Sequence, residues 1–140
     1  MQALIITKRP QIGELSQDLE LVTMETPEPR KNEVLVRVLF TTINVDDINL
    51  AEGTALGGIP IGASPSAQKP VIPGIEYSGT VEKIGANVTK FKVGDSVFGS
   101  INSPGKRYGA WATHFCSKEQ YITPKPDYLT YSEAAACAGS

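Results

Sequence analysis

The sequence contains few residues that could perform chemistry. His114 is the only histidine, and Cys116 and Cys137 are the only cysteines, among 140 residues. Neither cysteine has a second Cys or His beside it at zinc-like spacing, so both are expected to be free thiols. No G-x-S-x-G pattern is present, and no acidic residue is indicated as a partner for His114, so hydrolysis by a serine triad is disfavoured. His114 is expected to be a core or surface imidazole rather than an acid or base.

Basic blocks and long apolar runs are also missing. Thirteen Lys and Arg stand against fifteen Asp and Glu, a formal charge of −2, and no aromatic residues interleave with basic ones. Nucleic acid is therefore not an expected partner. No window approaches the roughly 18 apolar residues of a membrane span, and the opening MQALIITKRP lacks the order and length of a secretory signal. These absences predict a soluble, cytoplasmic protein without a membrane segment.

The 13 glycines do not form a phosphate-binding pattern. No two of them stand two positions apart, so G-x-G-x-x-G cannot occur, and glycine pairs five apart are never followed by Lys. These facts exclude both the dinucleotide fingerprint and the phosphate loop. The chain carries no nucleotide-binding motif of its own.

Short strand-like runs separated by turn residues make up most of what is present. Gly94-Asp95 predicts a tight bend, and the glycines suit short, strongly bent strands because backbones approach closely there. Six or more such strands predict a small antiparallel barrel or sandwich rather than a parallel sheet. The runs occupy residues 3–7, 19–25, 32–44, 76–85, 96–101, 109–117 and 121–126.

A short helix is predicted at VDDINLAEG, residues 45–53. Asp46 or Asp47 would supply the N-cap oxygen, and Gly53 would end the helix in a left-handed conformation. The segment that follows, residues 53–70, is rich in Gly, Pro, Ser and Ala, and predicts a long loop.

A second helix is predicted to begin near residue 131. Thr130 or Ser132 would cap it, with Glu133 in its first turn, before an alanine-rich run. Because this run has neither an amphipathic face nor a C-cap, further chain is expected beyond it.

The segments together resemble the medium-chain dehydrogenase/reductase superfamily. The resemblance is carried, in order, by MQALII, EVLVRV, INVDDINLAEG, PGIEYSGTVEKIGANVTKFKVGDSVFG and GAWATHFCSKEQYITPKPDYLTYSEAAA. It implies a mainly β fold with short helices, a GroES-like antiparallel β-barrel, over residues 1–126. Residues 127–140 would begin the helix that leads to a Rossmann domain, which is absent from this sequence.

Within that superfamily the chain resembles the zinc-independent quinone oxidoreductase branch. Zinc alcohol dehydrogenases carry Cys where this sequence has Asn44, and His where it has Ile75. A carboxamide binds zinc poorly and an isoleucine cannot bind it, so no metal site is expected. The cysteine-rich lobe of those enzymes also has no counterpart, because residues 99–109 contain no cysteine.

The resemblance implies roles for Asn44 and Asp47, which match the branch's spacing of Asn and Asp. Asn44 would lie beside the nicotinamide and the substrate as the catalytic, positioning residue, and Asn44 and Asp47 would both be cofactor-binding residues. From the residues alone, Asn44 as a strand-end group bonding nearby backbone and Asp47 as a helix cap are the alternatives. Glu76 is expected either in the cleft or in solvent at the start of a strand.

Two further features leave the substrate open. The Tyr and Arg that often follow the Asp in quinone oxidoreductases are Asn49 and Ala51 here. Tyr77 and Tyr108 could each give a proton to a reduced substrate, although packing is the preferred interpretation of both.

The function implied by the resemblance is hydride transfer from NADPH to a quinone or an α,β-unsaturated carbonyl. The cofactor would be bound mainly by the absent domain, so the isolated chain is expected to be inactive, and the full-length protein to be a possible homodimer. The alternative is a free-standing barrel that binds a small hydrophobe or a protein partner without catalysis. A β-barrel interaction module unrelated to dehydrogenases is the third hypothesis.

Overall fold

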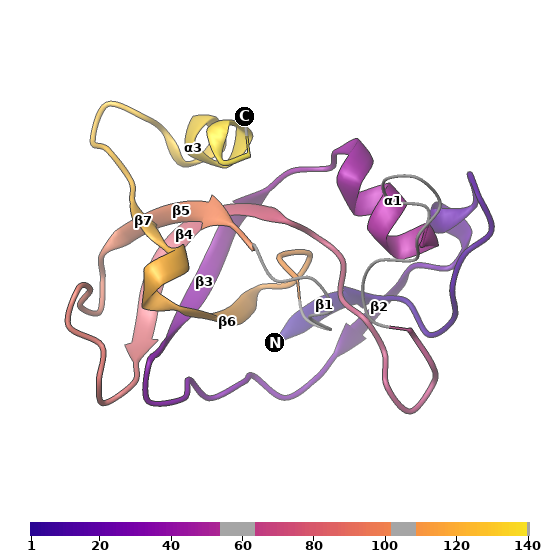
Figure 1. Cartoon of the computed structure of the whole chain (residues 1–140), viewed down its shortest axis with the longest axis horizontal. Coiled ribbons are helices and arrows are strands. Elements are labelled where there is room, and N and C mark those ends of the chain that lie inside the picture. The colour runs from indigo at the N-terminus through magenta and orange to yellow at the C-terminus, as the bar shows by residue number, and fades with distance from the viewer. Residues whose placement is uncertain (54–63, 102–108, 140) are drawn as a thin grey trace.

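The structure is a computed structural model that describes residues 1–53, 64–101 and 109–139. The strands within these residues form a five-stranded antiparallel sheet in the order β6-β3-β4-β5-β7 and a two-stranded sheet of β1 and β2 (Figure 1). The mainly β, antiparallel architecture predicted from the sequence is confirmed. The strands are β1 Gln2–Ile5, β2 Glu20–Thr23, β3 Glu33–Thr41, β4 Glu76–Ile84, β5 Ser96–Ser100, β6 His114–Lys118 and β7 Thr123–Pro124.

The two sheets are joined through β1, although they do not close into one continuous ladder within the described ranges. On the side away from β2, the Leu4 amide donates to the Trp111 carbonyl at 2.9 Å, and the Ile6 amide donates to the Val71 carbonyl at 2.9 Å. These bonds place β1 beside the segment that precedes β6. The arrangement is an open, barrel-like pair of sheets, with one hydrophobic cluster under the five-stranded sheet and a second around β1.

The main core lies under β3, β4 and β6, where alternate side chains point inward. Val36 pairs with Val81 on one side and with Phe115 on the other, and all three are buried. Tyr77 packs against Phe115 edge to face, with ring centroids 4.5 Å apart. This alternation explains why valine-rich runs form strands here, since β-branched and aromatic side chains fill a half-buried pleated surface.

The strand predicted at residues 109–117 begins later than expected, at His114. Before that point the backbone bonds elsewhere: the Ala110 amide donates to the Gly74 carbonyl and the Trp111 amide to the Pro73 carbonyl, each at 2.9 Å. Gly74 has φ of +103°, and a Cβ there would lie 2.5 Å from the Trp111 nitrogen. This close crossing takes the segment out of the ladder until His114.

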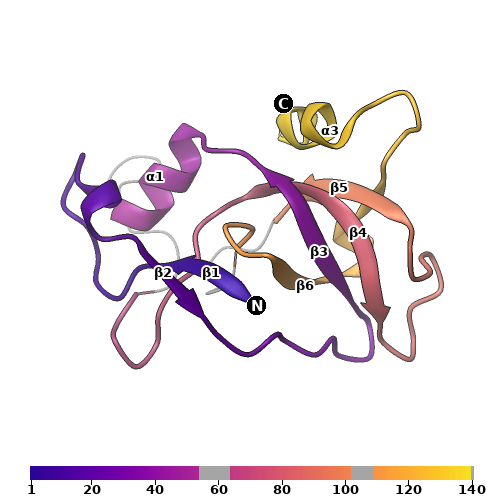
Figure 2. The same ribbon diagram turned by 180° about the vertical axis from the view of Figure 1, so that it is seen from behind.

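Helix α1, Val45–Glu52, follows the end of β3, and helix α3, Tyr131–Cys137, packs over the five-stranded sheet (Figures 1 and 2). Thr130 caps α3, as predicted, and forms a reciprocal capping box with Glu133. Tyr131 fixes the helix to the sheet: its carbonyl accepts from the Ser78 hydroxyl, and its own hydroxyl lies 2.7 Å from that of Ser96.

The far end of α1 is held by the loop after β1, which contains the short 3-10 helix η1, Leu15–Gln17. Gly53 ends α1 with φ of +74°, as predicted, and the Arg9 guanidinium donates to the Ala51 carbonyl at 3.3 Å. The buried Glu52 carboxylate accepts from the Gly13 amide at 2.8 Å. These contacts fix the direction of α1, and therefore the position of its first residues.

A second 3-10 helix, η2 Glu119–Tyr121, connects β6 to β7. Of the loop predicted over residues 53–70, residues 54–63 lie outside the described part of the chain. None of the described helices is long and apolar enough to cross a membrane.

Candidate functional site

The candidate site is built where β3 ends and the chain turns into α1. The Thr41 hydroxyl donates to the Glu76 carbonyl at 2.7 Å, and the next hydroxyl, of Thr42, donates to the Glu76 carboxylate. The Trp111 indole nitrogen donates to the Thr42 carbonyl at 2.9 Å. These three bonds hold the backbone that leads directly to Asn44.

Asn44 is the N-cap of α1. It has an extended backbone, with φ of −126°, and its carboxamide oxygen accepts from the amides of Asp46 at 2.8 Å and Asp47 at 3.3 Å. The expectation that Asp46 or Asp47 is the N-cap of this helix is therefore wrong, because the N-cap is two positions before Asp46 and three before Asp47. The cap uses the Asn44 oxygen and leaves the amide nitrogen as the part of the side chain that could meet a ligand.

Asp47 completes a capping box with Asn44. Its Oδ2 accepts from the Asn44 amide at 2.9 Å, while the residue is only 1 % exposed. Oδ1 makes no hydrogen bond of normal geometry among the described residues. Burial raises the pKa of the Asp47 carboxyl, the amides of Asn44 and Ile75 partly oppose this, and the negative charges of Glu76 and Asp46 add to it. A direct contact between Asp47 and a cofactor stays a prediction.

Glu76 lies inside the protein and not in solvent, with 8 % exposure. The end of α3 covers it, since a Cβ placed on Gly139 would lie 1.9 Å from Glu76 Oε1. Its carboxylate therefore contacts both the Thr42 hydroxyl and the backbone that follows α3. The sequence allowed Glu76 to lie either in the cleft or in solvent. In the structure it is buried and bonded to Thr42, two residues before Asn44.

Ile75, which precedes Glu76, is half-buried, and its hydrocarbon side chain supplies no atom that could bind a metal ion. Across residues 1–53, 64–101 and 109–139, no group of three or more His, Cys, Asp or Glu side chains is placed to hold a metal ion. The side chains of Asn44 and Asp47 accept hydrogen bonds from backbone amides, and the Glu76 carboxylate accepts one from the Thr42 hydroxyl. What the site offers is one amide group at the start of a rigidly held helix.

Thr42 and Trp111 are residues of this site that sequence reasoning missed. Their bond joins positions separated by 69 residues, and it depends on the crossing of the Trp111 segment over Gly74. The only available signal was that Trp111 is the single tryptophan, in a glycine-flanked run. That signal predicts burial but not the partner of the indole.

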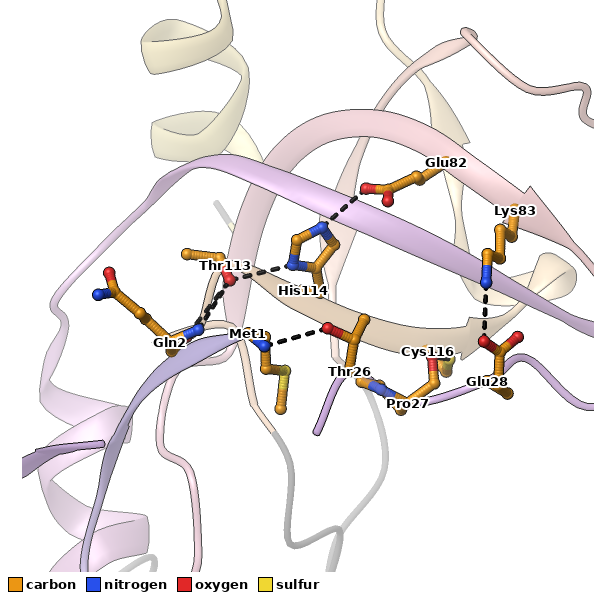
Figure 3. Close-up of polar contacts among 10 residues, drawn as sticks. All are labelled: Met1, Gln2, Thr26, Pro27, Glu28, Glu82, Lys83, Thr113, His114 and Cys116. Carbon is orange, nitrogen blue, oxygen red and sulfur yellow. Dashed lines mark hydrogen bonds and ion pairs between the residues drawn. The ribbon is translucent and has the colours of Figure 1, made fainter. Parts of the chain in front are cut away.

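His114 lies outside this site, at the start of β6, where its ring reaches toward Glu82 of β4 (Figure 3). Its Nε2 is 2.7 Å from Glu82 Oε2, and its Nδ1 is 3.0 Å from the Thr113 hydroxyl. The prediction of a core or surface imidazole is confirmed. The contact with Glu82 was not foreseen, because it spans β3 to reach β4.

Tyr77 is a core residue, as the packing interpretation held. It is fully buried, burial raises the pKa of its phenol, and the hydroxyl has no hydrogen-bond partner among the described residues. Tyr108, the other candidate proton donor, lies outside the described residues.

Comparison with known proteins identifies the class. Residues 30–127 match the alcohol dehydrogenase GroES-like domain. This match covers more than half of the chain, and the protein belongs to that family, the catalytic-domain family of medium-chain dehydrogenases/reductases. The resemblance inferred from the sequence is confirmed.

Individual proteins similar to this chain include two curated relatives and one solved structure. The synaptic vesicle membrane protein VAT-1 homolog-like of Homo sapiens is 33 % identical over 118 residues, which are 84 % of this chain and 25 % of that protein. The 2-methylene-furan-3-one reductase of Solanum lycopersicum is 30 % identical over 114 residues, 79 % and 28 % of the two chains. The structure of the quinone oxidoreductase from Coxiella burnetii superposes with a TM-score of 0.77 at 25 % identity, covering 97 % of this chain and 40 % of that one. The chain thus spans between 25 % and 40 % of the length of these three proteins.

Proposed function

We propose that this chain is the catalytic-barrel portion of an NADPH-dependent, zinc-independent oxidoreductase that transfers hydride to a quinone or an α,β-unsaturated carbonyl. The division into a barrel over residues 1–126 and a linking helix over 127–140 is part of the proposal, as are a cytoplasmic location and a homodimer of the full-length protein. Family membership supports the reaction type, since relatives include a 2-methylene-furan-3-one reductase and a quinone oxidoreductase.

The observation that carries the proposal is the placement of Asn44. The helix cap orients its carboxamide, and the bonds of Thr42 to Glu76 and Trp111 fix the backbone before it. A side chain held in this way can donate a hydrogen bond to a carbonyl without first having to be ordered. We assign Asn44 the role of orienting the acceptor carbonyl beside the nicotinamide.

The donor atoms at this site support a reaction without zinc. A tetrahedral zinc needs thiolate, imidazole or carboxylate ligands, whereas Asn44 and Ile75 stand at the positions that supply two of them in zinc enzymes. Quinones and enones are already electrophilic, so an amide donor suffices to orient them. The buried carboxyls of Asp47 and Glu76 then act through backbone and hydroxyl groups, by holding the Asn44 segment in place.

The Asn44 carboxamide is chemically suited to lie beside one edge of a nicotinamide, because its amide nitrogen can donate a hydrogen bond. NADPH supplies the hydride when bound. This chain contributes the Asn44 amide and the water-excluding walls around it, because the sequence has no dinucleotide fingerprint to hold the phosphates. We therefore expect the 140-residue chain alone to bind NADPH weakly and to turn over no substrate. Submicromolar NADPH affinity of the chain, measured by calorimetry, would contradict this division of labour.

Two substitutions of Asn44 test its role. Serine retains a side-chain oxygen for the cap but lacks the amide nitrogen, whereas alanine lacks both. In the product of the complete reading frame that contains this chain, we expect Asn44→Ser to lower kcat/KM for NADPH-dependent quinone reduction about 100-fold, close to Asn44→Ala. Thr130→Ala, which uncaps the other helix, is the matched control and should leave kcat/KM unchanged. Full activity of Asn44→Ser would show that Asn44 is only a cap.

A further inference from the structure

A groove of about 400 Å³ lies between the two-stranded sheet, the end of β3 and the segment that precedes β6. Ten of its thirteen lining residues are apolar, none is charged, and the other three are Gln2, Thr41 and Thr113. This volume lies within the range of ligand sites, roughly 300–1,000 Å³. The groove is therefore suited to a neutral, mainly hydrocarbon molecule.

A β-bulge explains why so many apolar side chains of β3 face this groove. Val38 pairs with Gly79 and Phe40 with Ser78, and the register shift between them leaves Leu39 without a partner. An extra residue turns neighbouring side chains toward the same side, and both Val38 and Leu39 line the groove. Leu39 is 42 % exposed there, an apolar side chain that the fold leaves open to solvent.

The groove ends beside the candidate site. Val38 and Ile43 both line it, five residues apart along an extended chain, which spans about 16 Å. Ile43 is 76 % exposed and directly precedes Asn44. Trp111 also lines the groove, and its only polar atom already donates to the Thr42 carbonyl. The ring thus presents apolar surface to the groove and anchors the Asn44 segment.

We propose that this groove holds the hydrocarbon tail of the acceptor whose carbonyl is oriented by Asn44, so that the substrates are quinones with an alkyl or isoprenoid chain. The proposal rests on the proposed function for the position of the carbonyl end. The groove supplies what a tail requires: mainly apolar lining, no charged group, and a lining residue, Ile43, that directly precedes Asn44. A larger partner is less suited, because a protein interface needs roughly 800 Å² from each side.

Trp111 provides a direct readout, since it is the single tryptophan. The experiment titrates the chain with a 1,4-benzoquinone that bears a ten-carbon alkyl chain, and with the same quinone without the chain, while Trp111 emission is recorded. We expect saturable quenching by the alkyl quinone at a half-saturating concentration about tenfold or more below that of the short quinone.

Leu39→Glu places a charge in the groove at an exposed position, and Val93→Glu makes the same change at a residue that is 61 % exposed and outside the groove. We expect Leu39→Glu to raise the half-saturating concentration of the alkyl quinone about tenfold and Val93→Glu to leave it unchanged. Circular dichroism spectra that match the parent chain verify that both variants fold.

Equal quenching by both quinones, or an alkyl preference that persists in Leu39→Glu, would overturn the proposal. Concentration-dependent dimerisation of the parent chain that Leu39→Glu abolishes would also overturn it, by assigning the groove to a second copy. Because the titration contains no NADPH and no turnover is measured, a failure of hydride transfer would leave a positive result here intact.

Discussion

Helices α1 and α3 both begin with a capping box, but the carboxyl of the α1 box is buried and that of the α3 box is exposed. Asn44 and Asp47 cap α1, and Thr130 and Glu133 cap α3, each through a reciprocal pair of side-chain and backbone bonds. Asp47 is buried, and its pKa is raised, chiefly by burial. Glu133 is exposed, and hydrogen bonds from Thr130, led by its amide, lower the pKa of its carboxyl.

The difference teaches that the cap motif determines where a helix starts, while its surroundings determine its electrostatics. On α3 the cap carboxylate is ionised at no cost and only stabilises the helix. On α1 the corresponding carboxyl is buried, and the nearby Glu76 carboxylate adds to the effect of burial, so ionisation of Asp47 opposes folding. Unfavourable buried groups of this kind are common at functional sites, which agrees with the site proposed at the start of α1.

Disrupting the crossing of Gly74 and Trp111, which holds the backbone before α1, should cause the largest loss of stability. Gly74→Ala would push a Cβ within 2.5 Å of the Trp111 backbone, at a positive φ that alanine disfavours. We expect a loss of about 3 kcal/mol in the free energy of unfolding, measured by urea denaturation. Trp111 emission should also shift to the red, since the indole leaves the Thr42 carbonyl.

The matched control is Gly94→Ala, because Gly94 also has a positive φ, of +94°, but a Cβ there meets nothing within 4 Å. It should lose only about 1 kcal/mol, the backbone cost alone. Equal losses from the two substitutions would refute the view that the Gly74 crossing supports α1.

Removal of each cap compares the two helices directly. Asn44→Ala should lower the free energy of unfolding by about 2 kcal/mol, because it removes the carboxamide oxygen that accepts from two backbone amides. Thr130→Ala should lower it by about 1 kcal/mol, because the Thr130 hydroxyl accepts from one. Chemical denaturation of both variants at pH 7 checks this order. The reverse order would mean that α1 tolerates the loss of its cap and is held from its Arg9 end alone.

The two carboxyls should give stability slopes of opposite sign. For Asp47 the folded pKa is raised above 3.8, so the parent chain matches Asp47→Asn at low pH and loses stability relative to it as pH rises through the folded pKa. For Glu133 the folded pKa is lowered below 4.5, so the parent chain gains on Glu133→Gln as pH rises toward 4.5. Denaturation midpoints from pH 3 to pH 7 measure both slopes, and slopes of one sign would contradict the assigned environments.

Local patterns in the sequence were sufficient to predict the strands, the Gly53 stop of α1 and the Thr130 cap of α3. Valine-rich runs form strands with buried side chains, and left-handed glycines and capping hydroxyls act within a few residues. The N-cap of α1 is two residues before Asp46 and three before Asp47, and the sequence does not distinguish these positions because Asn44, Asp46 and Asp47 can each cap a helix.

Local sequence patterns do not predict the contacts that build the site, because these contacts join residues far apart in the chain. Trp111 meets Thr42, Gly139 covers Glu76, and His114 reaches Glu82 only after the sheet has formed. The groove depends on an unpaired Leu39, and a single sequence does not indicate which strand position bulges. Physical reasoning from the residues alone favoured Asn44 as a strand-end group that bonds nearby backbone, and its oxygen does accept from the Asp46 and Asp47 amides. The role beside a nicotinamide comes from the family resemblance and stays a prediction.

The most direct test of the central claim, that acceptors are oriented by Asn44 without zinc, is the rate of NADPH-dependent quinone reduction before and after metal removal. The complete gene product would be dialysed against a strong chelator, analysed for zinc, and assayed with and without added zinc. We predict no stoichiometric zinc and an unchanged rate. One equivalent of bound zinc, with activity lost on chelation and restored by zinc, would contradict the account.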